Sequence, residues 1–415
     1  MSSSKAKQAS EPASKTTSKP ANKAANKPAK SASNAAPKPA AVMKDVVSRT
    51  ELTHAVATAS EVYRSNAMGV GVEAHMAMTF DGDFIRASTF AAAIKFPLKT
   101  KFKANVNGQT LAKIVGAFEN HGADDVKVSI KDSKMAISSG RSNVETVTLQ
   151  TDAGDIVSLK GAAELKVDAK TRDAILLAMS QALRCAATND VRYYLNGIHF
   201  TVENGDLIVL GVDGLSICRV NTGIKGADKF NGMSLTRDAA ESLIAIASRI
   251  ECTEDVMFYK KDTFGWRFSN GAEMRATVLE TPQDSNGDFA DALNKLVDMN
   301  TDKLSVVDTP DGLVDALSAG KIAATNGSPV YFNVENGVMS VKTGDINTGM
   351  VYRTTDIATK VRDTEAAYDV SLLTKIVKNP ADKILFYKDG PLYIGNVDMN
   401  DSGEGVRTFL MPMRV

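Results

Sequence analysis

Cysteines and long apolar runs are scarce in this chain of 415 residues. The three cysteines, Cys185, Cys218 and Cys252, are too few and too scattered for a disulfide framework or a zinc site. They indicate free thiols in a reducing compartment, and we expect the cytoplasm. No run of about eighteen apolar residues occurs, which excludes a membrane-spanning helix and a membrane as partner.

Motifs of common enzymes are absent as well. The sequence has neither a GxxxxGK(S/T) phosphate loop nor a GxSxG nucleophile elbow, and its four histidines lack metal-ligand spacing. Paired carboxylates such as Asp81 and Asp83 fall where solvated turns are expected. We therefore predict no catalytic residue, no metal and no cofactor, and a nuclease that uses paired carboxylates is a disfavoured alternative.

The formal net charge of zero hides a split between the two ends of the chain. Residues 1–42 hold eight lysines and one acid, whereas the rest of the chain holds 41 basic and 48 acidic residues. The N-terminal segment is rich in Ala, Ser, Pro and Lys and has no aromatic residue, so we expect residues 1–43 to be a disordered tail. It could attract an acidic partner, solubilise the protein or serve as a transit peptide.

The sequence that follows the N-terminal segment contains internal repeats. Residues 198–205 (IHFTVENG) and 330–337 (VYFNVENG) are offset by 132, and residues 76–83 (MAMTFDGD) are an earlier relative. Each predicts a β-hairpin, because Asn-Gly and Asp-Gly supply the positive φ angles of a two-residue turn. Residues 125–131, 255–261 and 383–388 form a second repeated strand.

Two helical patterns accompany these strands in each repeat. One set lies at residues 50–63, 171–187 and 311–324, and the other at 111–115, 243–247 and 373–377. The sequence therefore predicts an α+β chain of three similar domains, residues 44–163, 164–298 and 299–415, with helices on one face of antiparallel sheets. A threefold repeat without a catalytic constellation favours binding or assembly.

Two further strings resemble one family. Residues 190–197 read DVRYYLNG, followed by Val212-Asp213-Gly214, and the chain ends FLMPMRV. Together with residues 139–142 (SGRS), they resemble the bacterial-type β sliding clamp, the processivity subunit of the replicative DNA polymerase III. The resemblance implies three clamp domains per chain and a head-to-tail homodimeric ring around double-stranded DNA, held topologically without sequence specificity. Its implied partners are the replicative polymerase, the ATP-driven clamp loader and other proteins with clamp-binding peptides.

The resemblance also implies a peptide pocket between the second and third domains. Carried over by position, it comprises Leu195, Val212, Gly214, Leu215, Ser216, Ile217, Leu372, Pro391, Leu410, Met411, Pro412, Met413, Arg414 and Val415. The family usually has His-Arg where this chain has Leu215-Ser216. We therefore expect a more apolar pocket, a different peptide preference and a divergent, for example viral, member of the family.

For the bore of the ring, we expect basic residues on the repeated helices to contact phosphates. The candidates are Arg64, Lys113, Arg172, Arg184, Asn189, Arg237, Arg249, Lys321, Lys375 and Lys378. The resemblance places the dimer contact at Val144 and Thr146 on one side and Ile322 on the other. The alternative from another class is a clamp-like scaffold that keeps the pocket but does not encircle DNA.

Overall fold

The computed structural model describes most of the chain beyond the N-terminal segment. The described residues are 42–63, 73–118, 124–282, 289, 305–309, 312–323, 328–336, 338–343, 350–353, 364–378, 383–386, 392–395 and 405–413. The chain divides into two units, residues 1–40 and 41–415, and only the second contains described residues. The predicted tail therefore lies outside the described residues.

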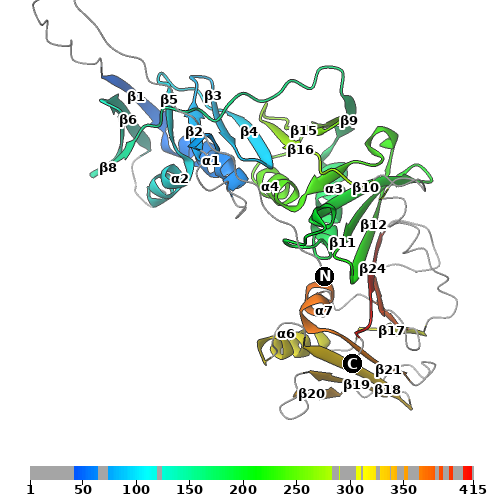
Figure 1. Ribbon diagram of the computed structural model, residues 1–415. Helices are drawn as coiled ribbons and strands as arrows, with labels where there is room; N and C mark the ends of the chain where they lie inside the picture. The colour runs from blue at the N-terminus through cyan, green and yellow to red at the C-terminus, as the bar shows by residue number, and fades with distance from the viewer. Residues whose placement is uncertain are drawn as a thin grey trace, which may run out of the picture. The chain divides into compact units, whose positions relative to one another are not determined.

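One order of elements occurs three times in the second unit: a strand, a helix, four strands, a second helix and three strands (Figure 1). Module 1 has β1 (Met43–Ser48), α1 (Arg49–Ser60), β2 (Ala77–Phe80), β3 (Phe84–Ser88), β4 (Ala92–Pro97), β5 (Ala104–Asn107), α2 (Gly108–Ala117), β6 (Asp125–Lys131), β7 (Lys134–Ser139) and β8 (Ser142–Val147). Module 2 has β9 (Ala163–Val167), α3 (Ala169–Ala182), β10 (Gly197–Glu203), β11 (Asp206–Val212), β12 (Ser216–Lys225), β13 (Ser234–Thr236), α4 (Arg237–Ala247), β14 (Asp255–Lys260), β15 (Thr263–Arg267) and β16 (Glu273–Thr277). Module 3 has β17 (Ser305–Asp308), α6 (Leu313–Ala323), β18 (Pro329–Glu335), β19 (Val338–Thr343), β20 (Met350–Arg353), β21 (Thr364–Asp369), α7 (Val370–Ile376), β22 (Lys383–Phe386), β23 (Leu392–Gly395) and β24 (Gly405–Leu410). Short 3₁₀ helices are η1 (Glu61–Tyr63), η2 (Glu73–His75), η3 (Tyr193–Leu195) and η4 (Asp228–Phe230).

The hairpins predicted from the repeats are confirmed. The pairs β2–β3, β10–β11 and β18–β19 are antiparallel neighbours. Asn204 and Gly205 have φ angles of 51° and 81°, and Asn336 has a φ of 50°, as tight hairpin turns require. The second repeated strand is β6, β14 and β22. The strand β9 starts at Ala163, one residue before the predicted start of the second domain.

The helices begin where the preceding strand supplies a side-chain oxygen. Asn107 caps α2 by accepting a hydrogen bond from the Thr110 amide at 2.9 Å, and Asp168 caps α3 through the Thr171 amide at 2.8 Å. Asp369 caps α7 through the amides of Ser371 and Leu372. The sequence thus encodes each start locally, at the strand-to-helix transition.

The strands form four antiparallel sheets, two of which cross from one module into the next. Their orders are β1-β6-β7-β8, β5-β2-β3-β4-β16-β15-β14-β9, β13-β10-β11-β12-β24-β23-β22-β17 and β20-β19-β18-β21. Modules 1 and 2 join where β4 pairs with β16, and modules 2 and 3 join where β12 pairs with β24 (Figure 1). Each joint is therefore a ladder of backbone hydrogen bonds within one continuous sheet.

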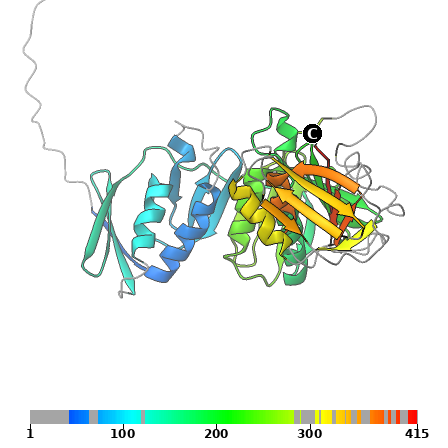
Figure 2. The same cartoon turned by 90° about the horizontal axis from the view of Figure 1, so that it is seen from below.

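The helices lie side by side in pairs, as α1 and α2 do in Figure 2, and pack on the sheets. The fit of α3 on its sheet depends on Gly211 in β11, because a Cβ atom there would lie 1.9 Å from the Ala182 carbonyl oxygen. At the first joint, α4 packs against η1 and α1. There the Arg249 guanidinium meets the buried Glu61 carboxylate at 2.6 Å.

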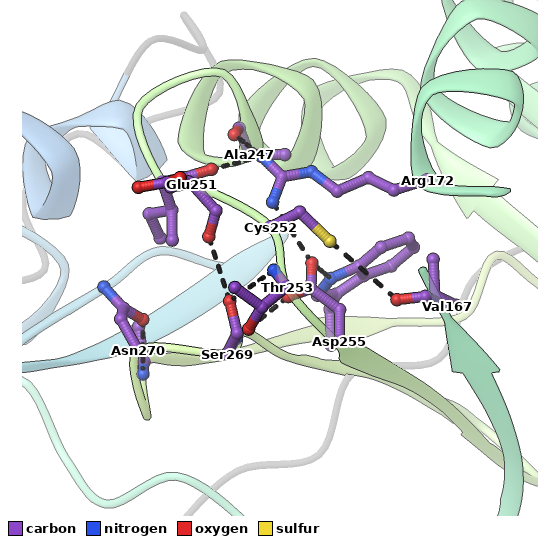
Figure 3. A network of polar contacts seen from close by, with 12 residues as sticks. Val167, Arg172, Ala247, Glu251, Cys252, Thr253, Asp255, Ser269 and Asn270 are labelled. Carbon is purple, nitrogen blue, oxygen red and sulfur yellow. Dashed lines mark hydrogen bonds and ion pairs between the residues drawn. The ribbon is translucent and has the colours of Figure 1, made fainter. Parts of the chain in front are cut away.

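A buried polar network holds the two helices of module 2 together (Figure 3). Arg172 on α3 donates to the carbonyl oxygens of Ala247 and Ile250 at the end of α4, and it pairs with Asp255 at 3.3 Å. Asp255 also accepts hydrogen bonds from the Trp266 indole and the Ser269 amide, both at 2.9 Å. Because Arg172 is 5% exposed, the prediction that it faces DNA is wrong.

We predict that Arg172→Met destabilises module 2 by about 3–5 kcal/mol, because the Asp255 carboxylate would remain buried without its cation. The measurement is urea unfolding followed by fluorescence of Trp266, the single tryptophan, which lies in the network. Lys166→Met is the matched control, because Lys166 pairs with Glu254 in solvent and should contribute at most about 1 kcal/mol. Equal losses in the two variants would contradict the prediction.

Candidate functional site

A small group of apolar side chains at the second joint is separate from the main core. Its buried members are Ala187, Leu195, Ile208, Leu210, Val212 and Ile217. Tyr194, Phe289 and Phe409 pack against them and are only partly buried. We call these nine residues the junction cluster, because Ile217 of β12 pairs there with Phe409 of β24.

The segment that follows α3 supplies one side of the junction cluster. The Ala187 amide donates to the carbonyl oxygens of Leu195 and Val212, and the Asn196 side chain bridges the amide and carbonyl of Asp190 at 2.8 Å each. Hydrogen bonds from the Arg192 side chain lower the pKa of the Asp190 carboxyl to about 2. Hydrogen bonds within this loop therefore fix its conformation.

The turn between β11 and β12 forms a rim next to this loop, and Arg192 donates a hydrogen bond to its Asp213 carbonyl oxygen at 3.4 Å. The Asp213 carboxylate accepts hydrogen bonds from the Leu215 and Ser216 amides at 2.9 and 2.7 Å, and Gly214 adopts a φ of +90°. The Leu215 side chain is 54% exposed, while its carbonyl accepts a hydrogen bond from the Met411 amide at 2.8 Å. Two exposed apolar side chains, Leu215 and Met411, thus stand on adjoining backbone segments.

The structure brings together only part of the predicted pocket. Leu195, Val212 and Ile217 belong to the junction cluster, whereas Leu410 is fully buried in the main core, so its assignment to the pocket lining is wrong. Leu372 is partly buried against the main core, and its place in the pocket stays a prediction. Strand alternation is the reason for Leu410, because its neighbour Phe409 has the side chain on the cluster face. Pro412 and Met413 are half-buried, and Pro391, Arg414 and Val415 lie outside the described residues.

Several cluster members were missed by the sequence analysis. Ala187, Ile208 and Leu210 are ordinary apolar residues of a turn and a strand, and periodicity does not distinguish them from core. Phe289 comes from the connection between modules 2 and 3 and packs edge-to-face against Tyr194, with ring centroids 5.2 Å apart. An isolated aromatic residue in a polar connection was the one available signal for it.

A basic groove of about 580 Å³ lies among α3, α4 and the end of α7. It is lined by Ser180, Leu183, Arg184, Thr188, Arg237, Glu241, Ile244, Ala245, Ser248, Lys375 and Lys378. Arg237 pairs with Glu241 and donates to the carbonyl oxygens at the end of α3, so it acts mainly as a structural cap. Within the described parts of the chain, Arg184, Lys375 and Lys378 have no ion pair to an acidic side chain.

The other predicted DNA-facing residues have different surroundings. Lys113 on α2 and Lys321 on α6 are exposed, as is Asn189, which has a φ of +58°. Arg249 is engaged with Glu61 at the first joint, and Arg64 lies outside the described residues. Fewer cations are thus available to bind a phosphate in the groove than the ten candidates of the sequence analysis included.

The described residues also lack two features. No group of three or more His, Cys, Asp or Glu side chains among them is arranged to hold a metal ion. No helix among them is long and apolar enough to cross a membrane.

Comparison with solved structures gives the fold. The β subunit of DNA polymerase III from Thermotoga maritima matches with a TM-score of 0.74 and 17% identity, over 90% of this chain and 100% of that one. The DNA polymerase sliding clamp of Caulobacter crescentus matches with a TM-score of 0.70 and 18% identity, over 90% and 100% of the two chains. The Borrelia burgdorferi β subunit, solved in complex with a natural product, matches with a TM-score of 0.73 and 12% identity, over 90% and 99%.

These likenesses cover all three modules, and the chain has the sliding-clamp fold. The expected fold class is confirmed. No family model matches the sequence, and neither does any curated protein.

One titratable group lies beside the junction cluster. His199 of β10 packs against Phe289, with ring centroids 5.0 Å apart, and its Nδ1 atom lies 2.8 Å from the Ser234 hydroxyl oxygen. Burial lowers the pKa of His199 from 6.5 to about 4. Above pH 6.5 the imidazole is neutral whether or not the chain is folded. Between pH 6.5 and about 4 only the unfolded chain takes up the proton, so acid removes stability.

We predict that the stability of module 2 falls by about 3 kcal/mol from pH 6.5 to pH 4 through this residue. Urea unfolding followed by Trp266 fluorescence at several pH values measures the slope of the unfolding free energy against pH. His199→Gln should flatten it, whereas His54→Gln, which alters an exposed histidine on α1, should not. An unchanged slope in His199→Gln would contradict the assignment.

Proposed function

We propose that this chain is a non-catalytic DNA sliding clamp, a processivity factor that forms a ring around duplex DNA and tethers a replicative polymerase. The observation that carries the proposal is the threefold module, whose sheets continue across both joints. One strand of each type that forms a joint, β20 and β8, lies at the edge of its sheet. The fold shared with the DNA polymerase III β subunits supports it. We place the protein in the cytoplasm, where free thiols remain reduced.

Ring closure follows from the equivalence of the joints. Each joint pairs the fourth strand of one module with the last strand of the next: β4 with β16, and β12 with β24. The corresponding unused strands are β20 of module 3 and β8 of module 1, each at an edge of its four-stranded sheet. Pairing of β20 from one copy with β8 from a second would repeat the same joint, and two such contacts close a head-to-tail dimer.

The surroundings of these edges suit an interface. Val144 and Val147 of β8 are 37% and 63% exposed, Thr146 is half-buried, and Ile322 on α6 is 88% exposed. Apolar side chains beside an open strand edge gain from burial when a second copy pairs. In this proposal Val144 and Thr146 contact the surface around Ile322 of the other copy.

For DNA, the basic groove provides the chemistry. Arg184, Lys375 and Lys378 have no acidic partner among the described residues, and Ser180 and Thr188 add hydroxyl groups. Such groups bind phosphates without reading base sequence. Lys113, Lys321 and Asn189 are further exposed candidates on the other helices and loops. Because a ring holds DNA topologically, contacts can be weak enough to permit sliding.

For partners, we assign the junction cluster with the Leu215 and Met411 rim as the site for short peptides of the polymerase, the clamp loader and other clamp-binding proteins. Two or three apolar anchors buried there contribute roughly 1.5–3 kcal/mol each, which leaves about micromolar affinity after the cost of association. Ser216 is buried and Leu215 exposed, so the rim offers an apolar contact where a cationic one is usual in the resembled family.

We predict that the protein stays on circular DNA and is lost from the same DNA after linearisation, when it is loaded by a cognate loader or by spontaneous threading. Topological retention depends on closed ends, whereas purely electrostatic binding is indifferent to ends and falls with salt. Gel filtration of protein–DNA mixtures at raised salt measures retention. Equal loss from both DNA forms would favour the clamp-like scaffold instead.

We predict that the double variant Val144→Asp with Val147→Asp halves the solution mass to that of the 44.2 kDa chain, because a charge on each exposed valine of β8 disfavours pairing of this edge with a second copy. Analytical ultracentrifugation measures the mass. Val157→Asp is the control, since Val157 is 66% exposed but lies in the connection between β8 and β9. A wild-type monomer, or a double variant that remains dimeric, would contradict the proposed interface.

A further inference from the structure

Two of the three cysteines lie together beneath the junction cluster. Cys185 is in the turn that follows α3, and Cys218 is on β12, between Gly211 of β11 and Thr408 of β24. Their relative exposures are 1% and 2%. The Ala182 carbonyl oxygen accepts a hydrogen bond from the Cys185 amide and lies against Gly211, the cross-strand neighbour of Cys218, so the turn that holds Cys185 packs next to Cys218.

A cavity reaches both thiols. It has a volume of about 350 Å³ and lies among α3, α7, β12, β23 and β24, with Cys185, Cys218 and Thr408 in its lining. Apolar side chains, including Ile376 and Ile394, form much of the wall, and Gln181, Arg184 and Thr408 add polar groups. A molecule as small as a peroxide therefore has space to approach the sulfur atoms, which buried structural cysteines ordinarily do not allow.

The two thiols have unequal acidities. The hydrogen bond with Cys185 lowers the pKa of Cys218, burial opposes this shift, and Thr408 and Arg184 lower the pKa further. The same hydrogen bond raises the pKa of Cys185, and burial raises it further. A thiol that donates a hydrogen bond to a neighbouring thiolate favours its ionisation, and such a pair suits a nucleophilic and a resolving cysteine.

We propose that Cys185 and Cys218 form an oxidisable dithiol, which a hydroperoxide converts into a disulfide joining the end of α3 to β12. This inference does not depend on the proposed clamp function. The disulfide would tie together the backbone on which the junction cluster stands, because Ala187 is two residues after Cys185 and Ile217 directly precedes Cys218.

The chemistry balances in two steps. The Cys218 thiolate attacks one peroxide oxygen, the O–O bond breaks, and the leaving alkoxide takes the Cys185 proton to become an alcohol, or water from hydrogen peroxide. Cys218 is then a sulfenic acid. The Cys185 thiolate attacks its sulfur, the S–O bond breaks, and the departing hydroxide takes a proton from solvent. Each sulfur loses one electron, and the peroxide takes up both.

The test treats the native full-length protein with a small excess of hydrogen peroxide, blocks remaining thiols by alkylation and maps the peptides by mass spectrometry. We expect an intramolecular Cys185–Cys218 link that dithiothreitol reverses, with Cys252 still alkylated. Cys252→Ser is the matched control and should form the same link, because the Cys252 thiol faces the Val167 carbonyl instead. Oxidation confined to Cys252, or a link only between chains, would overturn the proposal.

Two further measurements separate a working dithiol from mere proximity. In Cys185→Ala, oxidation should stop at a Cys218 sulfenic acid that a 1,3-diketone probe traps; no trapped product would overturn the assigned roles. In the wild-type protein, the disulfide should slow hydrogen exchange of the Ala187 amide, which donates to Leu195 and Val212, and leave module 1 unchanged. Unaltered exchange at Ala187 would overturn the coupling to the junction cluster.

Discussion

The antiparallel ladders between modules are the constraint on which the rest of this structure depends. At each joint the last strand of one module hydrogen-bonds to the fourth strand of its neighbour, so two modules share one eight-stranded sheet. Register fixes which side chains meet across the joint, as Ile217 and Phe409 do. The junction cluster exists because two modules contribute strands to the same sheet there.

The arginines show how one residue type serves two purposes. Arg172 and Arg237 satisfy carbonyl oxygens at the ends of α4 and α3, where the helices leave unpaired acceptors. Arg184 lines the basic groove without an acidic partner among the described residues. Burial and partners, not position on a repeated helix, decide which cation is available to a phosphate.

The dithiol and the junction cluster meet on β12 because strand side chains alternate. Ile217 lies in the junction cluster, while Ser216 and Cys218 turn to the side on which α3 packs, as does Gly211, the cross-strand neighbour of Cys218. A chemical change at the thiols therefore acts on backbone that both faces share. The cavity at this joint supplies the access that such chemistry needs.

The sequence by itself determined the threefold repeat, the hairpins with their Asn-Gly turns, the helices with their caps and the likeness to sliding clamps, because these depend on residues close together in the chain. The resemblance assigned Leu195, Val212 and Ile217 to one pocket, and the structure packs these three side chains in one cluster. Only the tertiary structure decided that sheets run across the joints, that Phe409 rather than Leu410 faces the cluster, that Phe289 joins it and that Arg172 is buried. These outcomes depend on register and packing between residues tens to hundreds of positions apart, which local patterns do not encode.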